Sequence, residues 1–172
     1  RAGYQDLLAE QAARRERGDV KQLGIGISTY VEVTAGGLFQ EYGAIEVHED
    51  GSVTATVGTS AHGQGHETSF AMIVQELLGV PMDKVTLVQS DTSVVPRGTG
   101  TMGSRSLQIG GSALYKASEE VLAKARQLAA HLLEANVSDI VLTDDGRIGV
   151  AGVPASALSW ADLSYVIPAT AL

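Results

Sequence analysis

The chain has 172 residues, of which 44% are hydrophobic and 19% charged, a composition typical of a soluble globular domain with a sizeable core. Its net charge of −8 argues against a general nucleic-acid binder, because neutralising phosphates needs a basic surface. It contains no cysteine and therefore offers no disulfide, zinc-thiolate or iron–sulfur site of its own. No apolar run is long enough to span a bilayer and no secretory signal is present, so we expect a cytoplasmic protein that does not enter a membrane.

We expect residues 1–172 to form a single domain or a fragment of one. The chain begins at Arg1 without a methionine and ends at Leu172 just after an apolar stretch. These ends favour a piece excised from a longer polypeptide, although a processed mature protein would look the same.

Hydrophobic periodicity and turn residues predict strands and helices along the whole chain. Two predicted hairpins turn at Asp50-Gly51 and Asp145-Gly146, dipeptides typical of tight turns. The order of the elements indicates an α+β fold, with helices packed on one face of a mixed β-sheet. The elements are a polar helix over 3–17, a strand over 23–33, a hairpin over 41–59, a helix over 67–78, a short strand over 84–89, a long helix over 107–134, a second hairpin over 140–150 and a short element that begins at Trp160.

The strand over 23–33 is predicted from alternation. Apolar residues occupy positions 23, 25, 27, 31 and 33, while glycines at 24 and 26 leave the other face bare. A period of two with glycine on one face is typical of a strand that another backbone approaches closely.

Two glycine-rich loops each run directly into a helical pattern. In the first loop, residues 58–67, Gly63 and Gly65 flank Gln64. Glycine lets backbone amides approach a ligand, and the Gln64 amide can both donate and accept, which suits a flat heterocycle with mixed edges. The alternative is a sharp strand-to-helix turn with Gln64 in solvent. The spacing by itself leaves both interpretations open.

The second loop, residues 96–106, precedes the long helix. Hydroxyls and free amides at the start of a helix form a phosphate cradle without lysine, and two arginines could add charge-assisted contacts. The alternative is a flexible Ser/Gly loop. Neither loop has the Gly-Lys-Ser/Thr step of a Walker loop or the Rossmann pattern. The polar residues of this loop are Arg97, Thr99, Thr101, Ser104, Arg105 and Ser106, with Gly98, Gly100 and Gly103 between them.

Other polar clusters favour structural interpretations. His62 and His66 are four residues apart, but the glycines between them disfavour a helical pair and no third ligand is evident, so we expect no protein-ligated metal. Glu41, Glu46 and Glu49 form an acidic hairpin that we interpret as a solvated face.

The two loops and the segments between them resemble the molybdopterin-binding large subunit of the xanthine dehydrogenase, aldehyde oxidase and carbon monoxide dehydrogenase family. The resemblance is strongest over 57–135 and extends from Leu23 to the end. The run as a whole is far more specific than either loop alone. It includes Gly58-Thr59, His62-Gly63-Gln64-Gly65-His66, Leu78-Gly79-Val80-Pro81-Met82-Asp83-Lys84-Val85, Ser90-Asp91-Thr92-Ser93-Val94-Val95-Pro96 and Gly100-Thr101-Met102-Gly103-Ser104-Arg105-Ser106.

This resemblance implies a fragment of a molybdenum-cofactor-binding domain. Gln64 would contact the pterin, with Gly63 and Gly65 giving backbone access. The second loop would wrap the phosphate end of the cofactor. Bacterial members of the family often carry the cytosine dinucleotide form, which the sequence does not distinguish from the mononucleotide. The matching residues of the second loop are Thr101, Gly103, Ser104 and Ser106.

The resemblance also implies what the chain lacks. The family hydroxylates its substrate with a metal-bound hydroxide, and a glutamate in a Gly-x-Gly-Glu segment removes the proton; that segment is absent here. We therefore assign no catalytic residue and expect the fragment to be inactive and empty of cofactor. Iron–sulfur and FAD subunits or regions would relay electrons in the parent enzyme. Surfaces that normally meet the rest of the subunit favour self-association into a homo-oligomer.

Two other functions remain as alternatives. The first is a non-catalytic α+β binding or assembly module whose Ser/Gly loop holds an anion or a partner segment. In that module Gln64 would matter little, whereas Ser104 and Ser106 would matter. The second is a stand-alone nucleotide-dependent enzyme, which the absence of lysine from both loops disfavours.

Overall fold

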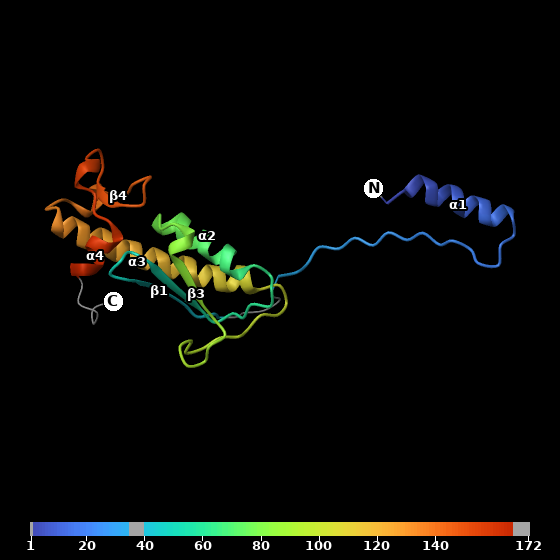
Figure 1. The fold of residues 1–172 in the computed structure, drawn as a ribbon, viewed down its shortest axis with the longest axis horizontal. Helices are drawn as coiled ribbons and strands as arrows, with labels where there is room; N and C mark the ends of the chain where they lie inside the picture. The colour runs from blue at the N-terminus through green and yellow to red at the C-terminus, as the bar shows by residue number, and fades with distance from the viewer. Residues whose placement is uncertain (1, 35–39, 167–172) are drawn as a thin grey trace. The chain divides into compact units, whose positions relative to one another are not determined.

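The computed structural model describes residues 2–34 and 40–166 (Figure 1). The chain divides into two compact units, residues 1–32 and residues 33–172. Whether residues 1–172 act as a single functional domain stays a prediction. In the parts of the chain that are described, no helix is both long and apolar enough to cross a bilayer.

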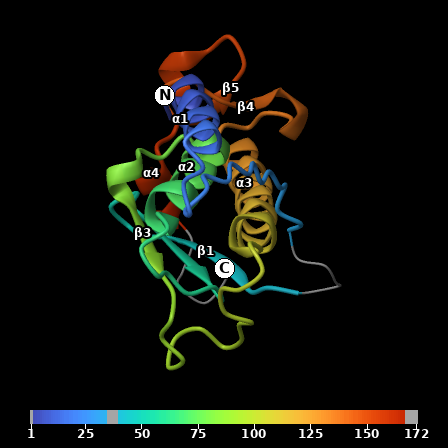
Figure 2. The ribbon, with the colours of Figure 1, turned by 90° about the vertical axis from the view of Figure 1, so that its right-hand side faces the viewer.

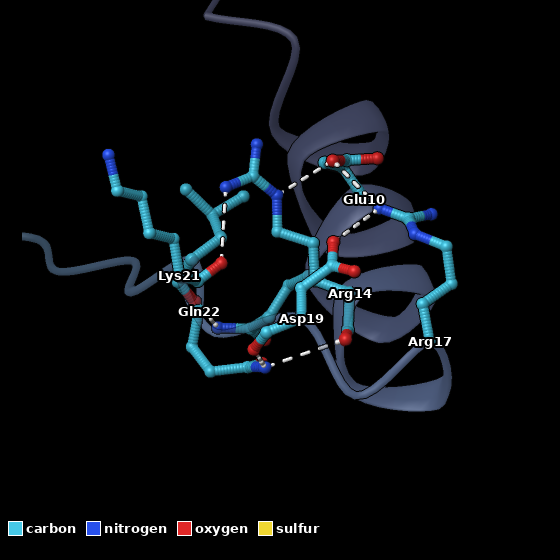
Figure 3. A network of polar contacts seen from close by, with 8 residues as sticks. Glu10, Arg14, Arg17, Asp19, Lys21 and Gln22 are labelled. Carbon is cyan, nitrogen blue, oxygen red and sulfur yellow. Dashed lines mark hydrogen bonds and ion pairs between the residues drawn. The ribbon is translucent and has the colours of Figure 1, made fainter.

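The first unit contains helix α1 (Tyr4–Glu16), as the sequence predicts. No residue of α1 is buried, so local pairs rather than packing hold the helix. The Glu10 carboxylate accepts hydrogen bonds from Arg14 at 2.7 Å and from Arg17 at 3.5 Å (Figure 3). Arg17 also pairs with Asp19 at 2.9 Å, just beyond the end of the helix. Of these pairs, only Glu10–Arg14 has the four-residue spacing that supports a helix, by a few tenths of a kcal/mol (~0.2–0.5).

The strand predicted over 23–33 is wrong. Residues 22–34 contain no regular secondary structure, and Ile27, Val31 and Val33 are 81%, 93% and 76% exposed. Alternation decides which side chains share a face, but a strand also needs a hydrogen-bonded neighbour. None of the described residues pairs with this segment as a strand.

The second unit is built around a mixed sheet, which confirms the predicted α+β class. Strand β1 (Gly43–Val47) pairs antiparallel with β2 (Val53–Val57), and β2 pairs in parallel with β3 (Val85–Val88). The first predicted hairpin is therefore correct, and its turn passes through Gly51, whose φ of 79° lies in the left-handed region that glycine favours. The parallel β2–β3 pair requires a crossover, which helix α2 (His66–Leu78) provides.

Helix α2 and the long helix α3 (Gly111–Leu132) lie side by side over the sheet (Figures 1 and 2). Because side chains alternate along a strand, the row of Val53, Ala55 and Val57 in β2 is buried toward the helices, and the threonines between them are half-buried. That row and the helix residues above it form the core of the unit. Its fully buried side chains include Val53, Ala55 and Val57 from β2, Phe70, Val74 and Leu78 from α2, and Leu114 from α3.

The start of the long helix departs from the prediction in its geometry. The helix predicted from residue 107 begins with a π-helical turn, Ser106–Gly110, before the α-helical part. Small residues here allow close packing: a Cβ on Gly110 would lie 2.8 Å from Thr59 Cγ2, and one on Gly43 would lie 2.6 Å from the Ala113 carbonyl carbon.

The C-terminal part confirms the second hairpin and the last element. Strands β4 (Ile140–Leu142) and β5 (Ile148–Val150) pair antiparallel in a separate sheet. Helix α4 (Trp160–Val166) follows, and the buried Trp160 indole donates to the Leu78 carbonyl at 2.8 Å. This bond ties the end of the described chain to the end of α2. Short 3-10 turns cover Met82–Lys84, Val137–Asp139 and Pro154–Ser156.

Candidate functional site

The structure brings the two glycine-rich loops together at one end of the sheet. Thr101 joins them although it is 41 residues from Ser60: its hydroxyl accepts from the Ser60 amide at 3.1 Å and donates to the Ser60 carbonyl at 2.5 Å. Because its one hydrogen goes to Ser60, Thr101 accepts from the Ser106 hydroxyl, 2.8 Å away. The Gly100 amide adds a long bond of 3.4 Å to the Gly58 carbonyl.

The loop backbones also touch at a pair of glycines. A Cβ on Gly98 would lie 2.3 Å from the Gly58 carbonyl oxygen, and a Cβ on Gly58 would lie 2.6 Å from Gly98 Cα. Any other residue at either position would force the backbones apart. Glycine is therefore needed here for contact between the loops, a role that the sequence pattern does not reveal.

The tip of the first loop is open. Gly63 and Gly65 have φ of 92° and 79°, and a Cβ added to either would meet nothing within 4 Å. Gln64 is exposed; its carboxamide oxygen accepts from the His62 amide, and its Nε2 donates to the Ser60 carbonyl at 3.3 Å. The sharp strand-to-helix turn is present, and Gln64 bonds within its own loop, so both interpretations of this loop stand.

The second loop divides into an open and a closed part. Gly100, Gly103 and Ser104 have positive φ of 69°, 60° and 51°. Gly103 and Ser104 are exposed, and a Cβ on Gly100 or Gly103 would meet nothing within 4 Å. By contrast Ser106 is buried and Thr101 half-buried. The four candidate residues of this loop therefore lie together, with Gly103 and Ser104 outside and the two hydroxyls of the Thr101–Ser106 pair inside.

Glu41 belongs to this site, and the prediction that it lies on a solvated acidic face is wrong. Its Oε2 accepts from the Thr99 amide at 3.2 Å and from the Thr99 hydroxyl at 2.8 Å, and its Oε1 accepts from the Tyr42 amide at 2.9 Å. No sequence signal could link two residues 58 positions apart. Glu46 and Glu49 are exposed, as expected.

Arg105 lies inside the second loop. It is 5% exposed, and its guanidinium donates to the carbonyls of Thr99 and, at 3.4 Å, Gly100. A guanidinium can serve several carbonyls at once because its donors form a fixed fork. Arg105 thus braces the loop from within, whereas Arg97 is exposed.

The two candidate histidines have different surroundings. His62 is exposed, and its Nδ1 lies 3.1 Å from the Ser60 carbonyl. His66 is buried, with Nδ1 3.0 Å from Gln89 Oε1 and its ring 4.9 Å from that of Phe70. Within residues 2–34 and 40–166 no group of three or more histidine, aspartate or glutamate side chains is arranged to hold a metal ion.

A turn at Asp91 leads into the second loop. The Asp91 carboxylate accepts from the Ser93 hydroxyl at 2.5 Å and from the Ser93 amide at 2.9 Å. These two bonds, the hydroxyl bond first, hold the pKa of Asp91 below its ordinary value, because they favour the ionised carboxylate. The Asp91 carbonyl in turn accepts from the amides of Val94 and Val95. These bonds close a turn just before the second loop begins at Pro96.

Comparison with known proteins identifies the family. A family model described as "Molybdopterin cofactor-binding domain" matches residues 1–169. The chain belongs to this family. The match includes both loops and both compact units of this molybdopterin cofactor-binding domain.

Named relatives extend the comparison. The chain is 36% identical to the carbon monoxide dehydrogenase large chain of Afipia carboxidovorans, over 95% of this chain and 22% of that protein. It is 34% identical to the nicotine 6-hydroxylase large subunit of Paenarthrobacter nicotinovorans, over 95% of this chain and 21% of the relative. The chain thus spans about a fifth of the length of the curated relatives it matches.

Solved structures agree in fold. A crystal structure of Cu,Mo-CO dehydrogenase superposes with a TM-score of 0.76 at 36% identity, covering 95% of this chain and 22% of that one. Quinoline 2-oxidoreductase from Pseudomonas putida 86 gives 0.72 at 35% identity, covering 93% and 21%. This molybdopterin cofactor-binding domain therefore has the fold of a segment of those enzymes, as the resemblance implied.

Proposed function

We propose that this chain binds the pterin and the phosphate of a molybdenum cofactor, as part of the large subunit of a molybdenum hydroxylase. The observation that supports this most directly is the joining of the two open glycine-rich loops through Thr101 and Ser60. One loop offers an exposed carboxamide, and the other offers exposed amides and a hydroxyl. Together they match a ligand with a heterocyclic end and an anionic end.

The residues present fit such a ligand. The space in front of Gly63, Gly65, Gly100 and Gly103 is open, so a flat or anionic group can approach the backbone. Ser104 combines a left-handed backbone with an exposed hydroxyl, and successive amides in such a turn form an anion-binding concavity.

We assign the direct contacts to Gly63, Gln64 and Gly65 for the pterin and to Gly103 and Ser104 for the phosphate. Thr101 and Ser106 bind each other and Ser60, and we assign them to the frame that holds the two loops in register, at the edge of the phosphate site. The cofactor, when bound, supplies the molybdenum centre for hydroxylation and accepts two electrons. None of the chain's own residues is assigned a catalytic step; they bind and orient.

Further features of the whole protein are proposed on the same basis. Relatives carry names such as "large chain" and "large subunit", which supports iron–sulfur and FAD partners that are either separate subunits or other regions of the parent enzyme, because this chain itself has no cysteine to hold a cluster. A cytoplasmic location, a homo-oligomeric state and the cytosine dinucleotide form of the cofactor belong to the same proposal. Sedimentation of the chain at high concentration tests self-association, which a strictly monomeric species would exclude.

Metal and pterin analysis of the full-length subunit, purified with its partners, tests the proposal. We expect roughly stoichiometric molybdenum, which Gln64→Ala, or Ser104→Ala combined with Ser106→Ala, removes. The matched control is Gln75→Ala, the same residue type on the exposed side of α2. Absence of molybdenum, or equal loss in the control, would contradict the assignment.

The alternative function is an anion-binding module without a pterin. The observation that favours it is that the Gln64 carboxamide already bonds within its own loop, to His62 and Ser60, whereas Ser104 is exposed. In that case the 172-residue chain binds inorganic phosphate, Ser104→Ala weakens the binding and Gln64→Ala leaves it unchanged.

A further inference from the structure

The carboxylate of Glu41 lies where three segments of the chain meet. Glu41 comes two residues before β1, and its Oε1 occupies the space that Gly58 leaves free: a Cβ on Gly58 would lie 2.0 Å from it. Its Oε2 reaches the second loop and accepts two hydrogen bonds from Thr99. One half-buried side chain thus joins the entry to the sheet, the start of the first loop and the second loop.

Thr99 is held from both sides. Glu41 binds its amide and its hydroxyl, while the buried guanidinium of Arg105 binds its carbonyl and that of Gly100. Hydrogen bonds to ionised groups are shorter and stronger than those between neutral groups. Thr99, which leads into the open part of the second loop, is therefore held at its amide by the negative Glu41 and at its carbonyl by the positive Arg105.

A carboxylate beside an anion-binding loop weakens anion binding because like charges repel, so Glu41 is not there to contact the anion. Here the oxygens of Glu41 point at donors of the protein, Tyr42 and Thr99. We propose that Glu41 is a positioning residue for the cofactor site, an inference that rests on the proposed function. By fixing Thr99 it sets where the following residues, Gly100–Ser104, present their amides and hydroxyl.

Hydrogen exchange of the 172-residue chain without cofactor tests the positioning itself. The Thr99 amide donates to Glu41, and we expect Glu41→Ala to speed its exchange about tenfold, the effect of losing a charge-assisted bond. The Gly100 amide donates to the Gly58 carbonyl, and its exchange should also speed up because the residue before it is no longer fixed. Glu41→Gln keeps one acceptor oxygen and should give a smaller change. Glu46→Ala, which removes an exposed glutamate of β1, should change neither amide. If Glu41→Ala does not fold, Thr99→Val removes the hydroxyl bond alone and takes its place.

Pterin content of the full-length subunit then separates this inference from the proposed function. We expect Glu41→Ala to lower retained pterin about tenfold and Glu41→Gln to restore part of it, with Glu46→Ala unchanged. Unchanged exchange in Glu41→Ala overturns the positioning role. Faster exchange with full pterin retention overturns its link to the cofactor. A wild-type subunit without pterin refutes the proposed function, and with it the cofactor part of the inference, while the exchange result stands by itself.

Discussion

The two glycine-rich loops have similar compositions but are anchored differently. The tip of the first loop bonds within the loop, through Gln64 to Ser60 and His62. The second loop is held from outside by the Glu41 carboxylate and the Ser60 backbone, and from within by the buried guanidinium of Arg105. Glycine content therefore does not measure how firmly a loop is fixed. Long-range hydrogen bonds decide that, and here they join the second loop to Glu41 and Ser60.

The largest effect should come from the contact between the loops. In Gly98→Ala the new Cβ would lie 2.3 Å from the Gly58 carbonyl oxygen, and neither backbone can rotate away as a side chain would. We expect a loss of about 3 kcal/mol in the free energy of unfolding, at the upper end for overpacking, measured by urea denaturation. Gly24→Ala, with nothing within 4 Å of its Cβ, is the control. Equal stability of the two variants would show that the loops are not in contact.

Removing the buried guanidinium of Arg105 should have the next largest effect on stability. Arg105→Met keeps the length of the side chain but takes its donors from the carbonyls of Thr99 and Gly100. A hydrogen bond to a charged group contributes about 1.5–3 kcal/mol, so we expect a destabilisation of about 2 kcal/mol in the same assay. Arg97→Met, at an exposed position, should stay within about 0.5 kcal/mol of the wild type. Equal stability of the Arg105→Met and Arg97→Met variants would show that Arg105 does not hold the second loop.

The tip of the first loop should tolerate change. Gln64 is exposed and bonds only to its own loop in the described structure, so Gln64→Ala should alter the free energy of unfolding by less than about 0.5 kcal/mol. Its expected effect is on pterin retention instead. A thermal-unfolding measurement beside the pterin assay checks this separation. Destabilisation beyond about 1 kcal/mol would mean that the tip supports the fold.

The smallest expected effect is on the stability of the fold in acid. The pKa of Asp91 is lowered in the folded chain, first by the Ser93 hydroxyl and then by the Ser93 amide. The unfolded chain therefore binds the proton more readily, so the contribution of Asp91 to stability is complete above its unfolded value of about 4 and is lost as the pH falls through the folded value below it. Ser93→Ala should flatten this dependence below about pH 4. An unchanged slope in acid titrations of stability would exclude the turn as its source.

Local signals predicted most of the elements correctly. The turn at Asp50-Gly51, the end of α2 at Gly79 with φ of 67°, and the turn at Asp145-Gly146 all depend on residues within a few positions of one another. The strand over 23–33 failed because alternation cannot supply a neighbouring strand. The π-helical turn at Ser106–Gly110 was expected to be α-helical, because its apolar residues continue the spacing of α3, which follows it.

The candidate site shows the same limit. Its seven predicted residues lie in two loops that do meet, but the sequence does not indicate which of them are open and which are paired. Ser104 and Ser106 are two positions apart, yet one is exposed and the other buried. Their different surroundings depend on Thr101 and Ser60, which only the folded chain brings together.

By itself, the sequence determined the order of helices and strands from β1 onward, the two glycine-rich loops and the resemblance that the family match confirms. These follow from backbone preferences, periodicity and a run of residues in fixed order, all of which are local. Only the tertiary structure decided that Glu41 holds Thr99, that Arg105 points inward and that Gly58 meets Gly98. Such contacts form when the sheet and its two helices close on a common core, because that packing sets the distance between residues far apart in the chain.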